Sequence, residues 1–341
     1  MIVGAKQLYR SSRHLSSLVF NFSPVRSVSS LQSLEESLKA AIQAKNYQHI
    51  PDLLNSSQDE NPKLLSFLSD FPRNNRTQII DEILQSFVPL RPRSRLRAAY
   101  SCLLCYTLQS PDPFPIALSI LQRTLRSGCV PVPQARLFLS SAWLEQLSQS
   151  RSVADILLGM RLIGYSPDSG TCNYVMSSLC AVDQLEEANE VLKGMTRAGC
   201  VPDLDSYGAV IGAMCSARRT SDAIEMLTQM VGKLGLTPRQ DMVAKMLATL
   251  LATKEIRKAV ETIEYLEREN YPLRFQSYER LVEGCLKCCE HVLAGKMVMA
   301  MTARGFIPYI DIRQKVVEGL AAHGEMDLVR AVRQRFVELR S

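Results

Sequence analysis

The sequence predicts an all-α protein, a right-handed α-solenoid built from helix-turn-helix repeats of about 35 residues. Three observations favour this fold class. Segment 169–203 recurs along the chain at an almost constant period. Its apolar residues return at three- and four-residue steps, as one face of a helix requires. No stretch sustains the alternation of a β-strand. A fixed period of this size is typical of a solenoid, in which each unit buries its apolar face against its neighbours.

Segment 169–203 shows the unit most clearly, as two short helices with an apolar face each. The face of the first helix contains Cys172, Val175, Met176, Leu179 and Cys180. The face of the second contains Leu185, Ala188, Val191, Leu192 and Met195. Two helices of this length cannot bury these faces alone, so the unit needs neighbouring units. We expect Leu179, Ala188, Leu192 and Met195 to be buried between helices.

Capping residues indicate where the second helix of this unit starts and stops. Asp183, followed three residues later by Glu186, predicts a capping box at its start. Gly199 stands where a left-handed residue ends a helix, and Pro202 prevents continuation.

The same layout divides most of the chain into units. Six units are expected, at residues 98–132, 133–168, 169–203, 204–239, 240–274 and 275–309. Residues 310–341 begin a further, partial unit that forms a C-terminal cap. Unit 240–274 lacks the glycine that ends the second helix in its neighbours.

The residues of unit 169–203 also identify the kind of repeat. The first helix reads N-Y-x-x-x-x-L-C from Asn173, the second contains L-E-E-A, and the exit reads M-x-x-x-G-x-x-P-D. This pattern resembles the pentatricopeptide repeat (PPR) family, of the plant organellar P-class type, from about Ala98 to the C-terminus. The tetratricopeptide alternative has a 34-residue period and a Trp/Leu-Gly/Tyr pattern that is absent here. The single tryptophan, Trp143, is not accompanied by the Leu-Gly and Tyr residues of that pattern.

Residues 1–30 differ in composition from the rest of the chain. They are rich in serine, contain four basic residues and lack acidic ones, since the first acidic residue is Glu35. This composition predicts an organellar transit peptide, whereas a secretory signal would need a longer apolar core. Arg10 and Arg13 lie near leucines on an amphipathic helix, which favours the mitochondrion over the plastid. A disordered N-terminal tail is the alternative.

Residues 31–97 read as irregular helices, which we interpret as degenerate hairpins that form an N-terminal cap. No apolar run approaches the roughly 18 residues of a membrane helix, so we expect no membrane insertion.

The net charge of the chain does not indicate a nucleic-acid-binding surface by itself. The formal charge is +6, and the four basic residues up to Arg26 account for +4 of it, which leaves about +2. One local cluster remains before the first clear repeat, consisting of Arg91, Arg93, Arg95 and Arg97. Such a run is usually a solvated face, and the alternative is a set of phosphate contacts.

The cysteines and histidines support neither a metal site nor an enzyme. Of ten cysteines, several recur at equivalent core positions of the repeat, which indicates buried free thiols. The run C-x-x-C-C-x-H from Cys285 to His291 has ligand-like spacing, but no second ligand pair follows, and we expect core packing instead. None of the four histidines stands in a nucleophile motif. We therefore expect no cofactor, no metal, no small-molecule substrate and no catalytic residue.

The resemblance implies that the partner is single-stranded RNA, with each repeat presenting one base to two side chains. The two positions lie near the start of the first helix and at the last residue of the repeat. Asn173 and Asp203 occupy them in the best unit, and in the family this pair implies a preference for uracil. We expect both to face the concave groove with unpaired side chains in the free protein. The alternative is that they only cap helices.

The other units depart from the family pattern. Their last residues include Asp168, Arg239 and Arg274, which are weaker candidates for RNA contact. The residues equivalent to Asn173 in these units are mostly unable to form hydrogen bonds to a base. The second residue of a unit is often a carboxylate, as at Asp205 and Asp241, and would repel phosphate. A base-by-base code along the whole array is therefore not expected.

Two functional hypotheses follow from these observations. The first is an organellar RNA-binding protein of limited sequence specificity that acts in transcript processing, stability or translation. The second is a protein scaffold, for example a subunit of an organellar ribosome or of another ribonucleoprotein, with ribosomal or other ribonucleoprotein proteins as its partners. The pair Asn173 and Asp203 favours RNA, whereas the near-neutral charge and the acidic second positions favour the scaffold.

Overall fold

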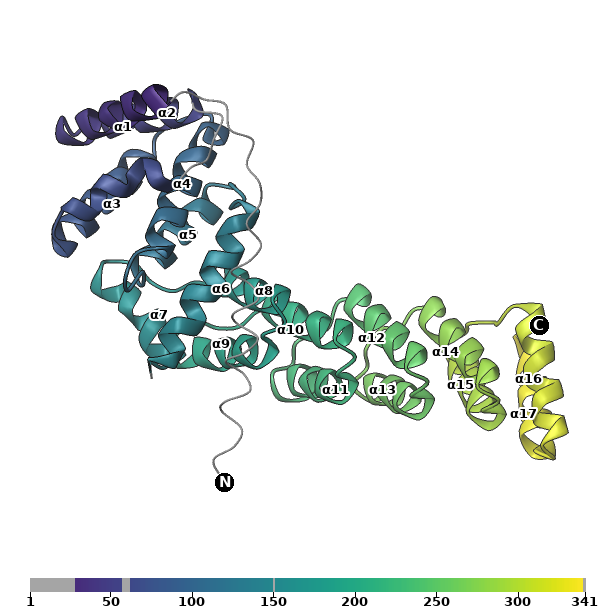
Figure 1. Cartoon of the computed structure of the whole chain (residues 1–341). Helices are drawn as coiled ribbons and strands as arrows, with labels where there is room; N and C mark the ends of the chain where they lie inside the picture. The colour runs from purple at the N-terminus through teal and green to yellow at the C-terminus, as the bar shows by residue number, and fades with distance from the viewer. Residues whose placement is uncertain (1–27, 57–61, 150, 340–341) are drawn as a thin grey trace. The chain divides into compact units, whose positions relative to one another are not determined.

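The computed structural model describes residues 28–56, 62–149 and 151–339, and all their regular secondary structure is helical (Figure 1). The all-helical repeat fold that the sequence predicts is confirmed. The described residues fall into two compact units, one ending at Leu90 and the other beginning at Arg91. The expected transit peptide, residues 1–30, lies almost entirely outside the described part of the chain, which begins at residue 28.

The first compact unit is a small helical group with its own core. Its helices are α1 (Val28–Gln43), the 3-10 helix η3 (Tyr47–His49), α2 (Ile50–Ser56), the 3-10 helix η4 (Pro62–Asp70) and α3 (Arg73–Ser86). Helix α1 packs on η4 and α2. Leu38 of α1, Leu54 of α2 and Leu68 of η4 are buried, so the apolar faces of these short helices close on one another.

The second compact unit contains the repeats. It starts with the 3-10 helix η5 (Arg93–Leu96), α4 (Arg97–Leu108), α5 (Ile116–Arg126), α6 (Pro133–Ser148), α7 (Val153–Leu162), α8 (Ser169–Ala181) and α9 (Leu185–Arg197). It continues with α10 (Leu204–Ser216), α11 (Thr220–Thr228), the π-helical turn η6 (Gln229–Lys233), α12 (Gln240–Ala252), α13 (Ile256–Arg268), α14 (Phe275–Lys287), α15 (His291–Ala303), α16 (Ile310–Ala322) and α17 (Met326–Glu338).

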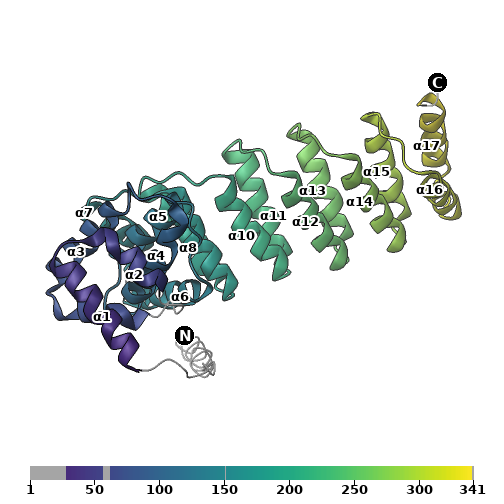
Figure 2. The same cartoon turned by 90° about the horizontal axis from the view of Figure 1, so that it is seen from above.

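The helices of the second unit pack in pairs, and the pairs stack in chain order. Each even-numbered helix from α4 to α16 contacts the next even-numbered one, which forms a continuous row (Figures 1 and 2). The odd-numbered helices lie beside this row, and most pack on the even-numbered helix before them, as α9 does on α8, whereas α7 packs on α9 and α5. Leu179, Ala188, Leu192 and Met195 are buried, as the sequence predicts. The row of first helices is the element that positions the candidate RNA-contact residues.

The turns between paired helices follow one backbone rule, and here one prediction is wrong. Asp183 does not cap α9; it adopts a left-handed conformation with φ of 60°, and the N-cap residue is Gln184, which has no side-chain capping bond. The residues at the corresponding turns of the later pairs share this conformation and are Arg218, Lys254, Cys289 and Gly324. The chain reverses tightly here, so backbone geometry rather than a side-chain cap ends the first helix.

The ends of the second helices match the sequence prediction better. Gly199 has φ of 74°, the left-handed value that a helix C-terminus favours and that glycine adopts without a Cβ clash. Asn270 takes the same conformation, φ 56°, in the unit that lacks the glycine. Asparagine tolerates this region better than most residues, which explains how this unit dispenses with the glycine.

A π-helical turn absorbs an insertion in the segment 204–239, which is one residue longer than segment 169–203. Helix α11 ends at Thr228 and continues as the π-helical turn η6. Such a turn accommodates one extra residue without breaking the helix. Met230 within it stays buried, so the core contact is kept despite the insertion.

Most cysteines of the described chain are buried in the core, among them Cys102, Cys105, Cys172 and Cys285. Cys289 is an exception to the predicted core packing, because it is exposed at a left-handed turn. Among the described residues, no group of three or more His, Cys, Asp or Glu side chains is arranged to hold a metal ion. No helix in the described ranges has the length and apolar character needed to span a membrane.

Candidate RNA-contact surface

Asn173 and Asp203 lie next to each other although thirty residues separate them in sequence. Asn173 projects from α8, and Asp203 is the N-cap residue of α10, the next helix in the row. The Asn173 Nδ2 atom donates a hydrogen bond to Asp203 Oδ1 at 3.1 Å. The two positions therefore lie side by side in the free protein. The prediction that their side chains are unpaired is wrong, because each is the partner of the other.

Ser206 completes this cluster, which we call the Asn173–Asp203–Ser206 cluster. Its backbone N–H donates to Asp203 Oδ1 at 2.9 Å, and its hydroxyl accepts from the Asp203 backbone N–H at 3.0 Å, which forms a capping box. The same hydroxyl donates to Asn173 Oδ1 at 2.6 Å. Asp203 is therefore both a helix cap and a partner of the amide.

The electrostatics of the cluster keep Asp203 ionised. Burial alone would raise the pKa of the Asp203 carboxyl. Hydrogen bonds from the Ser206 backbone N–H and the Asn173 amide outweigh burial and hold this pKa below its ordinary value. An ionised carboxylate can only accept hydrogen bonds, so Asp203 favours a partner that brings an N–H group.

Asp168 occupies the corresponding last position one unit earlier but has different partners. It caps α8, since the Thr171 backbone N–H and hydroxyl donate to its Oδ1 atom at 2.9 and 2.6 Å. Its Oδ2 atom forms an ion pair with Arg126 Nη2 at 2.8 Å. We call the position that Asn173 occupies in its unit the amide position. In unit 133–168 this position holds Leu137, which is exposed. Asp168 is thus engaged in a cap and an ion pair, and its unit offers a leucine where the next unit offers an amide.

Arg239 and Arg274 stand at the last positions of later units and are both exposed. Arg239 Nη2 forms an ion pair with Asp205 Oδ1 at 2.7 Å, so one of the acidic second positions is neutralised by a basic last position. Arg274 lines a hollow of about 230 Å³ between α12 and α14, together with Asp241 and Arg280. These arginines do not join the Asn173–Asp203–Ser206 cluster.

Sequence comparisons identify the repeat. The PPR repeat family profile matches residues 167–216, and the PPR repeat profile matches residues 205–233. A pentatricopeptide repeat-containing protein of Arabidopsis thaliana is 61% identical over 318 residues, which cover 93% of each chain. The chain belongs to the pentatricopeptide repeat family.

Solved structures of other family members align over much of the chain. The maize pentatricopeptide repeat protein PPR10 aligns with a TM-score of 0.41 and 14% identity, covering 98% of this chain and 57% of the maize protein. The PPR domain of Arabidopsis thaliana protein-only RNase P 1, solved in complex with tRNA, aligns with a TM-score of 0.32 and 17% identity, covering 66% of this chain and 98% of that domain.

The arginine run of this pentatricopeptide repeat protein belongs to the second compact unit. Arg91, Arg93, Arg95 and Arg97 are all exposed, around the 3-10 helix η5 and the start of α4. Arg93 donates from Nη1 to the carbonyl of Arg126 at the end of α5, at 3.1 Å. A basic side chain at a helix C-terminus satisfies an orphan carbonyl, so Arg93 has a structural contact as well as an exposed charge.

Glu279 occupies the amide position of PPR unit 275–309 and disfavours an RNA contact there. Burial, followed by the nearby charges of Glu283 and Asp311, raises the pKa of its carboxyl. Within the described part of the chain, its buried Oε1 atom has no hydrogen-bond partner. A carboxylate in this position neither donates to a base nor attracts phosphate.

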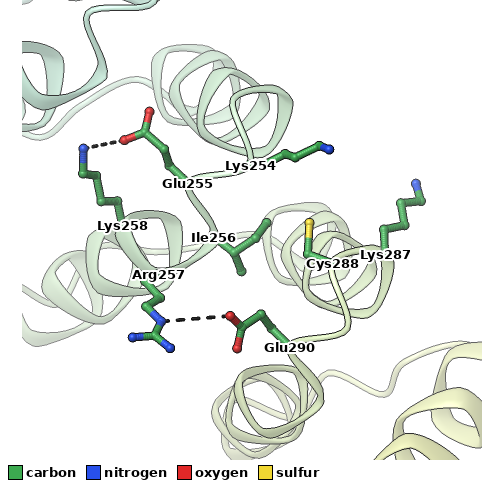
Figure 3. Close-up of a pocket in the computed structure, with 8 residues that line it drawn as sticks. All are labelled: Lys254, Glu255, Ile256, Arg257, Lys258, Lys287, Cys288 and Glu290. Atoms are coloured by element: carbon green, nitrogen blue, oxygen red, sulfur yellow. Dashed lines mark hydrogen bonds and ion pairs between the residues drawn. The ribbon is translucent and has the colours of Figure 1, made fainter.

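A cavity of about 580 Å³ lies at the turns between α12 and α13 and between α14 and α15 (Figure 3). Both basic and acidic side chains line it. Lys258 pairs with Glu255, and Arg257 Nε lies 4.0 Å from Glu290 Oε1. Four of its charged groups thus pair among themselves, and we assign no ligand to this cavity.

Sequence reasoning missed two partners in the PPR array. Ser206 is signalled only by the D-x-x-S spacing from Asp203, the capping-box pattern with serine in place of glutamate. Arg126 gives no local signal, because its partner Asp168 lies 42 residues away. Both are contacts between successive units, which become visible only when the units stack.

Proposed function

We propose that this protein binds single-stranded RNA and contacts one base through Asn173 and Asp203. Membership of the pentatricopeptide repeat family supports RNA as the partner. The observation that carries the proposal is the Asn173–Asp203 pair on neighbouring first helices, held at 3.1 Å. An amide beside an ionised carboxylate offers both a donor and an acceptor to the edge of a base. The family resemblance implies that the preferred base is uracil.

The specificity we propose is limited to few nucleotides. At the other unit borders the amide position holds residues such as Leu137, Gly208 and Ala244, none of which has a side-chain donor. Asp168 and Arg239 are in ion pairs, so we propose them as secondary contacts that would first have to exchange partners. Arg274 is proposed as a contact for the RNA backbone. The protein then acts in transcript processing, stability or translation as a binder, with no catalytic residue of its own.

Phosphate contacts are proposed for Arg91, Arg93, Arg95 and Arg97. Replacing these arginines should weaken binding to all RNA sequences alike, because phosphate contacts hold no sequence information. Binding should also become less sensitive to salt, because the slope against log salt falls by about 0.7 for each phosphate of a single strand that is no longer neutralised. A set of titrations at several salt concentrations measures this slope. An unchanged slope after all four replacements would remove the run from the binding surface.

A protein scaffold is the second candidate. Exposed carboxylates at the second positions, such as Asp241 and Asp311, favour it, since they oppose an RNA backbone. Crosslinking of the tagged protein in organelle extract, with and without nuclease, separates the two. We expect the partners to disappear on nuclease treatment. Retention of ribosomal or other ribonucleoprotein partners after nuclease would favour the scaffold.

We also propose that the protein acts in the mitochondrion, with the plastid as the alternative. The support is the basic, serine-rich and acid-poor composition of residues 1–30. Sequencing the N-terminus of the protein isolated from each organelle tests this. A mature chain that still begins at Met1 would contradict import by a cleaved transit peptide.

A further inference from the structure

We infer that Ser206 is a positioning residue for base recognition, which fixes the amide of Asn173 in one orientation. This inference rests on the proposed function, because it concerns the same contact with RNA. It adds a residue from the following unit to the pair that contacts the base.

The geometry singles out the hydroxyl of Ser206. Its side chain is fully buried, so no water competes for its hydrogen bonds. The hydroxyl has one proton and two nearby acceptors, Asn173 Oδ1 at 2.6 Å and Asp203 Oδ1 at 3.0 Å. The shorter contact is the better hydrogen bond, and Asp203 Oδ1 already accepts from the Ser206 backbone N–H. The proton therefore goes to the amide oxygen.

The orientation of the Asn173 amide follows from these two partners. The carboxylate of Asp203 can only accept, so the amide nitrogen must face it. The Ser206 hydroxyl donates, so the amide oxygen must face Ser206. Both ends of the amide are thus held, and one N–H remains to meet a base. Without the hydroxyl, the amide oxygen loses its donor and only the Asp203 contact holds the side chain, so the amide can rotate away from the orientation in which it meets the base.

The border between units 133–168 and 169–203, at Asp168, also has a hydroxyl group, but this hydroxyl does not orient an amide. Thr171 occupies the corresponding position, three residues after Asp168, and its hydroxyl donates to the carboxylate at 2.6 Å. Leu137 stands at the amide position of that unit and has no group for the hydroxyl to orient. Thr171 therefore supports a helix cap alone, whereas Ser206 supports a cap and an amide.

The later unit borders also lack the combination of hydroxyl and amide. Met242 and Ile312 take the place of Ser206 at two of them and have no hydroxyl. Ser277 keeps the hydroxyl at a third border, but Ala244 stands at the amide position of the preceding unit. The positioning role is therefore particular to Ser206.

The test uses the full chain and a pool of short single-stranded RNAs of random sequence, selected by binding and then sequenced. The variants are Ser206→Ala, Ser206→Cys and Ser206→Thr, with Thr171→Ala as the matched control for removal of a capping hydroxyl. We expect Ser206→Ala to lower the base preference at one nucleotide by about tenfold, in the range that one base-specific contact contributes. Ser206→Cys should lower it less, because a thiol is a weak donor, and Ser206→Thr should retain it. Thr171→Ala should leave it unchanged.

Circular dichroism melting curves show which variants are folded at the assay temperature. If one Ser206 variant is unfolded, the other substitutions of Ser206 still test the inference. Parent-like preference in a folded Ser206→Ala or Ser206→Cys variant would overturn the inference. Equal loss in the Ala and Thr variants would also overturn it, since the hydroxyl would then not be the determinant. If the parent chain selects no base at all, the proposed function itself fails, which is a different result.

Discussion

The unit borders at Asp203 and at Asp168 hold the same residue at the same position of the repeat, yet the two carboxylates have different partners. Asp203 accepts from the amide of Asn173, while Asp168 forms an ion pair with Arg126. Both cap the helix that follows. Whether the last carboxylate of a unit meets an amide therefore depends on the side chain that the first helix of the same unit places beside it, asparagine at Asn173 and leucine at Leu137.

The largest effect is expected from removing each carboxylate. Asp203→Ala and Asp168→Ala should each destabilise the fold by about 1 kcal/mol, because both variants lack an N-cap. Urea denaturation measures this. Only Asp203→Ala should also abolish the base preference, since the amide position beside Asp168 holds a leucine. Asp203→Asn is the matched control, because asparagine retains capping ability but not the charge. Loss of base preference in both alanine variants would show that the two borders act alike, and would contradict the claim that only Asp203 takes part in base recognition.

A smaller effect is expected at Glu279, where the amide position holds a carboxylate. Burial and the charges of Glu283 and Asp311 raise the pKa of Glu279. Ionisation therefore costs the folded state stability at neutral pH. That stability is regained as the pH falls through the raised pKa toward the ordinary value of 4.5. Glu279→Gln should stabilise the fold at neutral pH by at most about 0.5 kcal/mol, because solvent screens most of the effect, and should flatten the pH dependence in this window. Melting temperatures across this pH range, with Glu283→Gln as a comparison, test the sign. A destabilised Glu279→Gln variant would contradict it.

The smallest effect is expected from Arg126, whose contact with Asp168 is an exposed ion pair. Arg126→Met should reduce stability by about 0 to 1 kcal/mol, and this reduction should shrink at high salt. If the freed Asp168 carboxylate becomes available to RNA, binding should change at a second nucleotide. An Arg126→Lys variant, which keeps the charge, serves as the control. A large destabilisation that salt does not affect would indicate that Arg126 contributes by packing instead.

The sequence predicts the repeat architecture well because a helical unit records its period and its apolar faces locally. The burial of Leu179 and Met195 and the left-handed Gly199 follow from such local signals. The proximity of Asn173 and Asp203 follows from the family resemblance. The turn at Asp183 does not follow from the sequence, because aspartate there is equally compatible with an N-cap. Arg126 and Ser206 escape sequence reasoning since their partners are set by stacking between units, which no short spacing encodes.

The most direct test of base recognition is an equilibrium titration of the parent and of Asn173→Thr with short RNAs that differ at one base. A hydroxyl cannot reproduce the paired donor and acceptor of the amide. The parent should prefer one base, and Asn173→Thr should lose about 1 to 3 kcal/mol of discrimination at that nucleotide. It should bind with the parent's salt dependence, because no phosphate contact changes. If Asn173→Thr binds every RNA as the parent does, Asn173 is a structural residue, and the protein scaffold becomes the better account.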